Sequence, residues 1–117
     1  MEKLRHNQRR RVPRVMVDIP VTLTWGKKRF RTHAIQLSEF GTLVAGTYKD
    51  LVGEKVLVEL QLEPPTGSLS TPAVVVYAND AGTGIRFEID DLGKIADLKN
   101  YVQARGIGVI KPSQPTT

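Results

Sequence analysis

The stretch VMVDIPVTLTW, residues 15–25, decides the fold of this 117-residue chain. Every odd position in it is apolar, and Asp18, Thr22 and Thr24 lie between these positions. A two-residue period suits an extended strand, because successive side chains point to opposite faces of a sheet. Pro20 cannot donate a ladder hydrogen bond, so we expect an edge or a bulge at that point. The stretch therefore predicts a β-strand.

Five further strands are predicted after this one. A turn at residues 26–28 leads into a second strand over residues 30–38, and its alternation changes phase between Ala34 and Ile35, which indicates a bulge. Residues 41–47, 55–63 and 84–89 and a segment through 74–77 also have strand character, and turn-forming residues at 64–68 and 79–82 separate the last three. In 55–63 one face carries Val56, Val58, Leu60 and Leu62. Six short strands in succession favour a closed antiparallel β-barrel.

A helix is predicted after residues 90 and 91, two aspartates either of which can cap it. Helical spacing is followed by Leu92, Ile95, Leu98 and Val102, with Ala96 beside them. The helix is expected to end near Gly106. Its apolar stripe is expected to plug one end of the barrel, and docking of a partner is the alternative.

The composition is typical of a soluble globular domain. With 40% hydrophobic and 25% charged residues, the 117-residue chain suffices for one core. It has no cysteine, which excludes disulfides and thiol chemistry. The longest apolar run, 73–78, is far shorter than the roughly 20 residues that span a bilayer. We expect a cytoplasmic protein with a flexible basic arm (1–8), a barrel domain with its helix (9–105) and a disordered tail (106–117).

The positive charge of the chain belongs to its first fourteen residues. These contain six of the seventeen Lys and Arg residues and one acidic residue, whereas eleven basic residues balance eleven acidic ones from Val15 onward. The formal net charge of +5 therefore lies in one short segment, which is expected to bind an anion.

Two short motifs flank the first two strands. Arg10 and Arg14 precede the first strand, where their guanidinium groups offer planar forks that fit a phosphate or the edge of guanine. The second motif, residues 36–41, supplies the amide of Gln36 and the hydroxyl of Ser38, and Gly41 permits positive φ or a close backbone approach.

With these motifs, the sequence from Gln8 to Tyr101 resembles the PilZ domain family, whose members are bacterial effectors of the second messenger cyclic di-GMP. The R-x-x-x-R motif of that family is similar to residues 10–14, and its [D/N]-x-S-x-x-G motif to residues 36–41. Residues 84–87, Gly-Ile-Arg-Phe, are similar to a pattern on the last strand of such domains. The resemblance implies a six-stranded antiparallel barrel with a C-terminal helix, in agreement with the strand pattern.

The resemblance also implies how the ligand binds. Arg10 and Arg14 would contact guanine edges and phosphates, and Ser38 and Gly41 the second guanine and a nearby phosphate. Arg9 stands before the motif, where an arginine tends to accompany a stacked two-molecule form of the ligand, and we therefore expect that form.

Two more arginines are candidates for ligand contact, Arg11 and Arg86. Arg86 alternates with Ile85 and Phe87 and so lies outside the core, facing either the mouth of the ligand site or solvent. Gln36 departs from the family pattern, which has Asp or Asn. Its extra methylene is expected to lower the affinity by about tenfold at most, because a single hydrogen bond is worth roughly 0.5–1.5 kcal/mol.

The predicted mechanism is a switch in which the arginine arm orders over the barrel on ligand binding and passes the signal to a protein partner. One alternative is a PilZ adaptor that binds no nucleotide. Another is a small nucleic-acid-binding barrel, which is less favoured because Trp25, Phe30 and Phe87 have core-like positions. No catalytic set is recognisable, and His6 and His33 have no metal-ligand partners at readable spacing. We therefore predict neither an enzyme nor a metal site.

Overall fold

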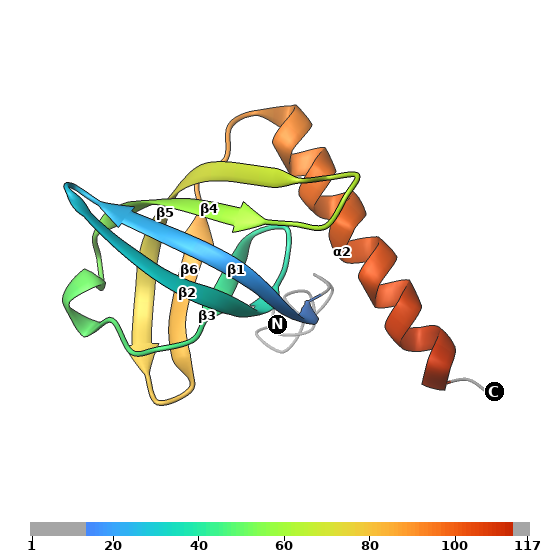
Figure 1. Ribbon diagram of the computed structural model, residues 1–117, viewed down its shortest axis with the longest axis horizontal. Coiled ribbons are helices and arrows are strands. Elements are labelled where there is room, and N and C mark those ends of the chain that lie inside the picture. The colour runs from blue at the N-terminus through green and yellow to red at the C-terminus, as the bar shows by residue number, and fades with distance from the viewer. Residues whose placement is uncertain (1–13, 114–117) are drawn as a thin grey trace, which may run out of the picture.

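The computed structural model describes residues 14–113, with side chains up to Arg105, and it forms a closed six-stranded antiparallel barrel with one C-terminal helix (Figure 1). The predicted fold class is confirmed. Around the barrel the strands follow the order β1-β2-β3-β6-β5-β4, and β4 pairs with β1 to close it. The elements are β1 (Val15–Trp25), β2 (Lys28–Leu37), β3 (Gly41–Val44), η1 (Lys49–Leu51), β4 (Lys55–Gln61), β5 (Ser68–Asn79), β6 (Gly82–Phe87) and α2 (Leu92–Ser113).

The alternation of β1 places its apolar side chains inside the barrel. Ile19, Val21 and Leu23 are at most 3% exposed. The irregularity expected at Pro20 is found immediately before it, where the pairing of β1 with β2 shifts register between Met16 and Ile19. The pairing of β1 with β4 begins only after Pro20, at Val21. On the β4 side, Pro20 therefore faces no carbonyl group that would need a hydrogen bond from the N–H group that proline lacks.

The bulge predicted in β2 is present. The pairing of β2 with β3 shifts between Ala34 and Gln36, so that Ile35 is the extra residue. Because a bulge changes the phase of the strand, both Ala34 and Leu37 reach the core, three positions apart. The clean alternation of β4 is confirmed as well, since Val56, Val58 and Leu60 within the strand and Leu62 just after it are all buried.

The helix α2 begins at a cap formed by Asp91. Its carboxylate Oδ1 accepts hydrogen bonds from the backbone N–H groups of Gly93 and Lys94, at 2.8 and 3.3 Å. These bonds satisfy two N–H groups that have no partner inside the helix. Leu98 and Val102 belong to the core of the barrel, so the predicted plug is confirmed.

The structure differs from the predicted helix at Leu92, at Ala96 and at the C-terminal end. Leu92 is 81% exposed and Ala96 is also exposed, whereas Tyr101 is buried. A step of three residues falls about 60° short of a full helical turn, so the series from Leu98 back to Leu92 drifts off the buried face. The helix also continues past Gly106 to Ser113, because lengthening an existing helix costs far less than starting one. In the described part of the chain, no helix is long and apolar enough to cross a membrane.

A polar cluster joins α2 to the turn that follows β4. The hydroxyl of Tyr101 and the guanidinium of Arg105 both donate hydrogen bonds to the carboxylate of Glu63. Arg105 also donates to the Tyr101 oxygen at 2.7 Å and lies over its ring, 5.1 Å from the centroid. The hydrogen bonds from Tyr101 and Arg105 hold the pKa of Glu63 below its usual value.

The lowered pKa of Glu63 makes this cluster sensitive to acid. Its carboxylate stabilises the folded state above the ordinary pKa of a glutamate, and that contribution is lost as the pH falls through the lowered pKa of the folded state. Wild type should therefore be more stable than Glu63→Gln near neutrality. The difference should shrink on acidification below about pH 4, the region of the ordinary glutamate pKa, in urea unfolding series at several pH values. Glu59→Gln removes one carboxylate from β4 and serves as control. A difference that is unchanged in acid would contradict the role of the cluster.

Candidate functional site

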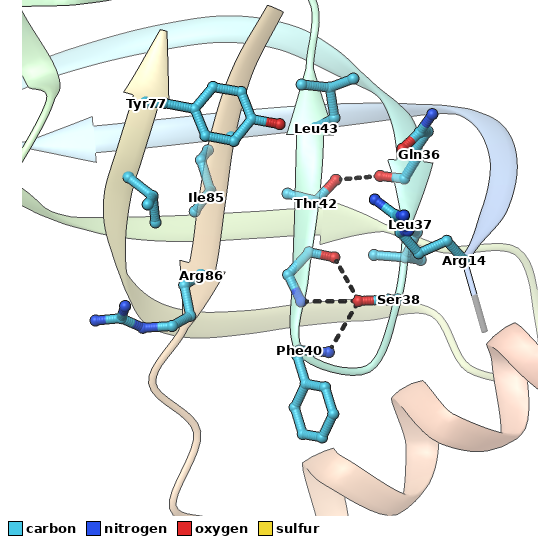
Figure 2. A pocket seen from close by; sticks show the side chains of 13 residues that line it. Arg14, Gln36, Leu37, Ser38, Phe40, Thr42, Leu43, Tyr77, Ile85 and Arg86 are labelled. Carbon is cyan, nitrogen blue, oxygen red and sulfur yellow. Dashed lines mark hydrogen bonds between the residues drawn. The ribbon is translucent and has the colours of Figure 1, made fainter. Parts of the chain in front are cut away.

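A pocket of about 240 Å³ opens where β1 begins, β2 ends and β3 begins (Figure 2). All the described candidate residues line it: Arg14, Gln36, Ser38, Gly41 and Arg86. Three other candidates, Arg9, Arg10 and Arg11, lie outside the described residues. The structure thus brings together side chains from both sequence motifs and from the last strand.

The turn between β2 and β3 is built around the hydroxyl of Ser38. Its Oγ accepts hydrogen bonds from the backbone N–H groups of Phe40 and Gly41, at 3.1 and 3.2 Å, and lies 3.4 Å from the carbonyl oxygen of Gly41, to which it donates. The Ser38 N–H group donates to the same carbonyl at 2.9 Å. A hydroxyl has one donor and two acceptor sites, so this turn uses all three. Ser38, only 8% exposed, therefore shapes the backbone of the pocket.

Gly41 is required by the close approach of β3 to β6. A Cβ atom at this position would overlap the backbone carbonyl oxygen of Ile85, so no residue with a side chain fits here. The φ angle of Gly41 is not positive. The sequence left two reasons for a glycine here, a positive φ or a close backbone approach, and the second is correct. The N–H group of Phe87 donates to the carbonyl of Phe40 at 2.8 Å and fixes the same contact.

Arg14 and Arg86 lie on opposite sides of the Ser38 turn (Figure 2). Arg14 is exposed just before β1, and Arg86, also exposed, projects from β6. One guanidinium nitrogen of Arg86 lies 3.9 Å from a carboxylate oxygen of Glu88, an ion pair too long and too exposed to fix the side chain. Arg86 lines the pocket, and in Figure 2 its guanidinium extends away from the Ser38 turn.

Within the described part of the chain, Gln36 is held by a hydrogen bond to its backbone, and its amide side chain makes none. Its carbonyl oxygen accepts a hydrogen bond from the hydroxyl of Thr42 at 2.7 Å across the β2–β3 pair. Its half-buried side chain lines the pocket beside Arg14. The amide of Gln36 is thus placed where it can meet a ligand.

An apolar wall of the pocket was not expected from the sequence. It is formed by Val76 and Tyr77 of β5, which are 47% and 46% exposed although they are neighbours in a strand. The pairing of β5 with β6 shifts register between Val75 and Tyr77, and this irregularity turns both side chains outward. The Tyr77 ring lies against Gly84, where a Cβ atom would overlap it. The pairing of Tyr77 with Gly84 follows from the shifted register of β5 and β6, which the sequence does not reveal.

The pocket combines two exposed guanidinium groups with an apolar and aromatic wall. Such a set suits a ligand that has both anionic groups and flat rings. In residues 14–113, no three acidic or histidine side chains gather closely enough to hold a metal ion.

The fold is a small closed β-barrel domain with a pocket beside the turn between β2 and β3. A model of the PilZ domain matches residues 8–104, which is most of the chain. The chain belongs to the PilZ domain family. No curated protein sequence matches it significantly.

Solved structures share the fold at low sequence identity. Bacillus subtilis MotI (DgrA), an inhibitor of motility, is 20% identical with a TM-score of 0.70, and the match covers 86% of this chain but only 52% of that one, so the chain spans about half its length. The PilZ domain of Escherichia coli YcgR with c-di-GMP is 14% identical with a TM-score of 0.70, covering 93% and 100% of the two chains. The PilZ domain of CeSA from a cellulose-synthesizing bacterium is 19% identical with a TM-score of 0.61, covering 84% and 98%.

The role of Ser38 in shaping the turn predicts a loss of stability on truncation. Ser38→Ala removes the acceptor of two part-buried N–H groups, and because each hydrogen bond is worth roughly 0.5–1.5 kcal/mol, the free energy of unfolding should fall by about 1–3 kcal/mol in a urea titration. Ser68→Ala removes a hydroxyl that bonds only the exposed side chain of Gln61 and should change stability by less than about 0.5 kcal/mol. Equal effects of the two substitutions would show that Ser38 does not support the turn.

Proposed function

We propose that the protein is a cyclic di-GMP-binding effector that acts on a protein partner in the bacterial cytoplasm. Two observations support the proposal. The chain belongs to the PilZ domain family, and its structure brings Arg14, the Gln36–Gly41 segment and Arg86 to the rim of one pocket. The second observation carries the proposal, because these residues are far apart in the sequence.

The chemistry of the pocket matches the parts of this ligand. The guanidinium of Arg14 can form paired hydrogen bonds with a phosphate or with the O6/N7 edge of guanine. The exposed wall of Val76 and Tyr77 offers apolar area to a purine ring. The PilZ domain of YcgR has been solved with c-di-GMP, and at 14% identity it supports the shared fold, so the ligand of the present chain remains a proposal.

Within this proposal, the residues of the second motif have different roles. Ser38 uses its hydroxyl within the turn, so we assign it to positioning the backbone. Gly41 keeps β3 against β6 and leaves the floor of the pocket free of a side chain. The amide of Gln36 then makes the polar contact of this motif with the ligand. Arg86 supplies a second cation beside Arg14.

The basic arm completes the proposed mechanism. Arg10 would act with Arg14, and Arg9 and Arg11 would help a stacked pair of ligands to bind. Neutralisation by the ligand phosphates removes the repulsion between the arginines, so that the arm orders over the barrel. The ordered arm, or the exposed side of α2, would then present a changed surface to the partner.

Isothermal titration with cyclic di-GMP at physiological salt tests this function. We expect saturable binding at micromolar or lower concentration with two ligands per protein. Arg14→Ala should weaken it at least about tenfold, because a charge-assisted hydrogen bond is worth about 1.5–3 kcal/mol, and the Arg10→Ala plus Arg14→Ala variant should lose it.

The control for this titration is Arg31→Ala, which removes an exposed arginine of β2 that does not line the pocket and should leave the affinity unchanged. One ligand per protein would contradict the stacked form. No heat from any of the proteins would favour the adaptor that binds no nucleotide, whose function then depends on its partner surface alone.

Gln36 offers a gain-of-function test. Gln36→Asn restores the shorter amide of the family pattern and orders one fewer rotatable bond on binding. It should raise the affinity for cyclic di-GMP by up to about tenfold in the same titration. Gln61→Asn, at the exposed end of β4, is the matched control. An unchanged or weaker affinity for Gln36→Asn would show that the amide of residue 36 does not contact the ligand.

A further inference from the structure

A second pocket lies at the opposite end of the barrel. It has a volume of about 330 Å³ and is lined by Trp25, Lys28, Phe30, Tyr48, Lys49 and Asp50. Strand β1 begins beside Arg14, which lines the first pocket, and ends at Trp25, which lines the second, and the two pockets share no lining residue.

Three aromatic side chains form one side of this pocket. Trp25, Phe30 and Tyr48 pack against the core but are only partly buried. The rings of Phe30 and Tyr48 are tilted by 58° with centroids 5.5 Å apart, and the indole N–H of Trp25 donates to Glu54 at 3.3 Å. The sequence pattern predicts Trp25 and Phe30 in the core, where their rings would not be available to form a binding surface. In the structure these side chains gather at a pocket and are held in place.

Charged groups of both signs border the aromatic side. The ammonium of Lys28 lies 5.7 Å from the centroid of the Trp25 ring, and Lys49 and Asp50 follow on η1. No ion pair between described residues uses any of these three charges. The pocket thus offers two ammonium donors, one carboxylate acceptor and three aromatic rings within the space of a small molecule.

We propose that this pocket binds a nucleoside phosphate. Each kind of group fits one part of such a ligand. The base packs on the aromatic side chains, Lys28 and Lys49 hold the phosphate, and Asp50 accepts a hydrogen bond from a base N–H or a ribose hydroxyl. Inorganic phosphate would not use the rings, and a phosphorylated ring without N–H or O–H donors would not use Asp50.

The same chemistry has two sources, a free nucleotide or one unit of a single-stranded nucleic acid, where bases stack on aromatic side chains. The proposal does not depend on binding of cyclic di-GMP, because the two pockets are lined by different residues.

The chain contains a single tryptophan, Trp25, and it lines this pocket, so its fluorescence reports occupancy directly. The intact protein is titrated with GMP, AMP, UMP and inorganic phosphate, with correction for absorption by the bases. We expect a saturable change of Trp25 fluorescence with at least one nucleotide and none with phosphate. No saturable change with any nucleotide, or the same change with phosphate alone, overturns the proposal.

Two charge-matched double variants locate the site. Lys28→Gln plus Lys49→Gln should raise the half-saturating nucleotide concentration about tenfold or more, because both phosphate donors are lost. Lys55→Gln plus Lys99→Gln removes two exposed lysines that do not line the pocket and should leave it unchanged, as should Arg14→Ala at the first pocket. Equal effects of the two double variants would mean that the lysines attract the nucleotide only through the overall charge of the protein. This result would overturn the proposed site. Thermal melts check that each variant is folded.

An eight-nucleotide oligouridine separates the two sources. Half-saturation at a concentration at least about tenfold below that of UMP, with a steep loss of affinity on adding salt, identifies a nucleic-acid strand as the ligand. Half-saturation at the same nucleotide concentration for the oligouridine and for UMP identifies the free nucleotide as the ligand. Either result supports the pocket, provided that the Lys28→Gln plus Lys49→Gln variant raises the half-saturating concentration as stated above.

Discussion

The contact of Gly41 with β6 is the constraint on which both the barrel and the candidate site depend. Strands β3 and β6 are distant in the sequence, and their pairing is one of the steps that make the barrel continuous. At Gly41 the two backbones lie so close that no side chain fits between them. The same contact sets the floor of the pocket, so a residue that closes the fold also leaves room for a ligand.

The polar residues around this floor divide into those that hold the backbone and those that face the pocket. Ser38 uses its hydrogen-bonding capacity on the turn, and Thr42 uses its hydroxyl on the Gln36 carbonyl. The groups left for a ligand are the guanidinium groups of Arg14 and Arg86, the amide of Gln36 and the wall of Val76 and Tyr77. The hydroxyls of Ser38 and Thr42 thus hold the backbone that shapes the pocket.

Much of the fold follows from patterns that are local in the sequence. The alternation of β1 and β4 identifies buried faces, the change of phase at Ile35 marks a bulge, and the pair Asp90 and Asp91 marks the start of the helix, where the structure assigns the cap to Asp91. The features that escaped prediction depend on contacts between distant segments. The outward side chains of Val76 and Tyr77 result from a register shift against β6, and the partial exposure of Trp25 depends on how η1 meets the β1–β2 hairpin. The exposure of Leu92 follows from helix geometry and was predictable from its spacing.

The central claim is that cyclic di-GMP binds in the pocket between the Ser38 turn and β6, and amide chemical-shift mapping by NMR tests it most directly. We expect added ligand to shift the amide signals of Gly41, Thr42, Gly84 and Arg86, with little change at Gly26 and Lys28 at the far end of the barrel. Shifts that are absent, or that gather only at the far end, would contradict the assignment of this pocket.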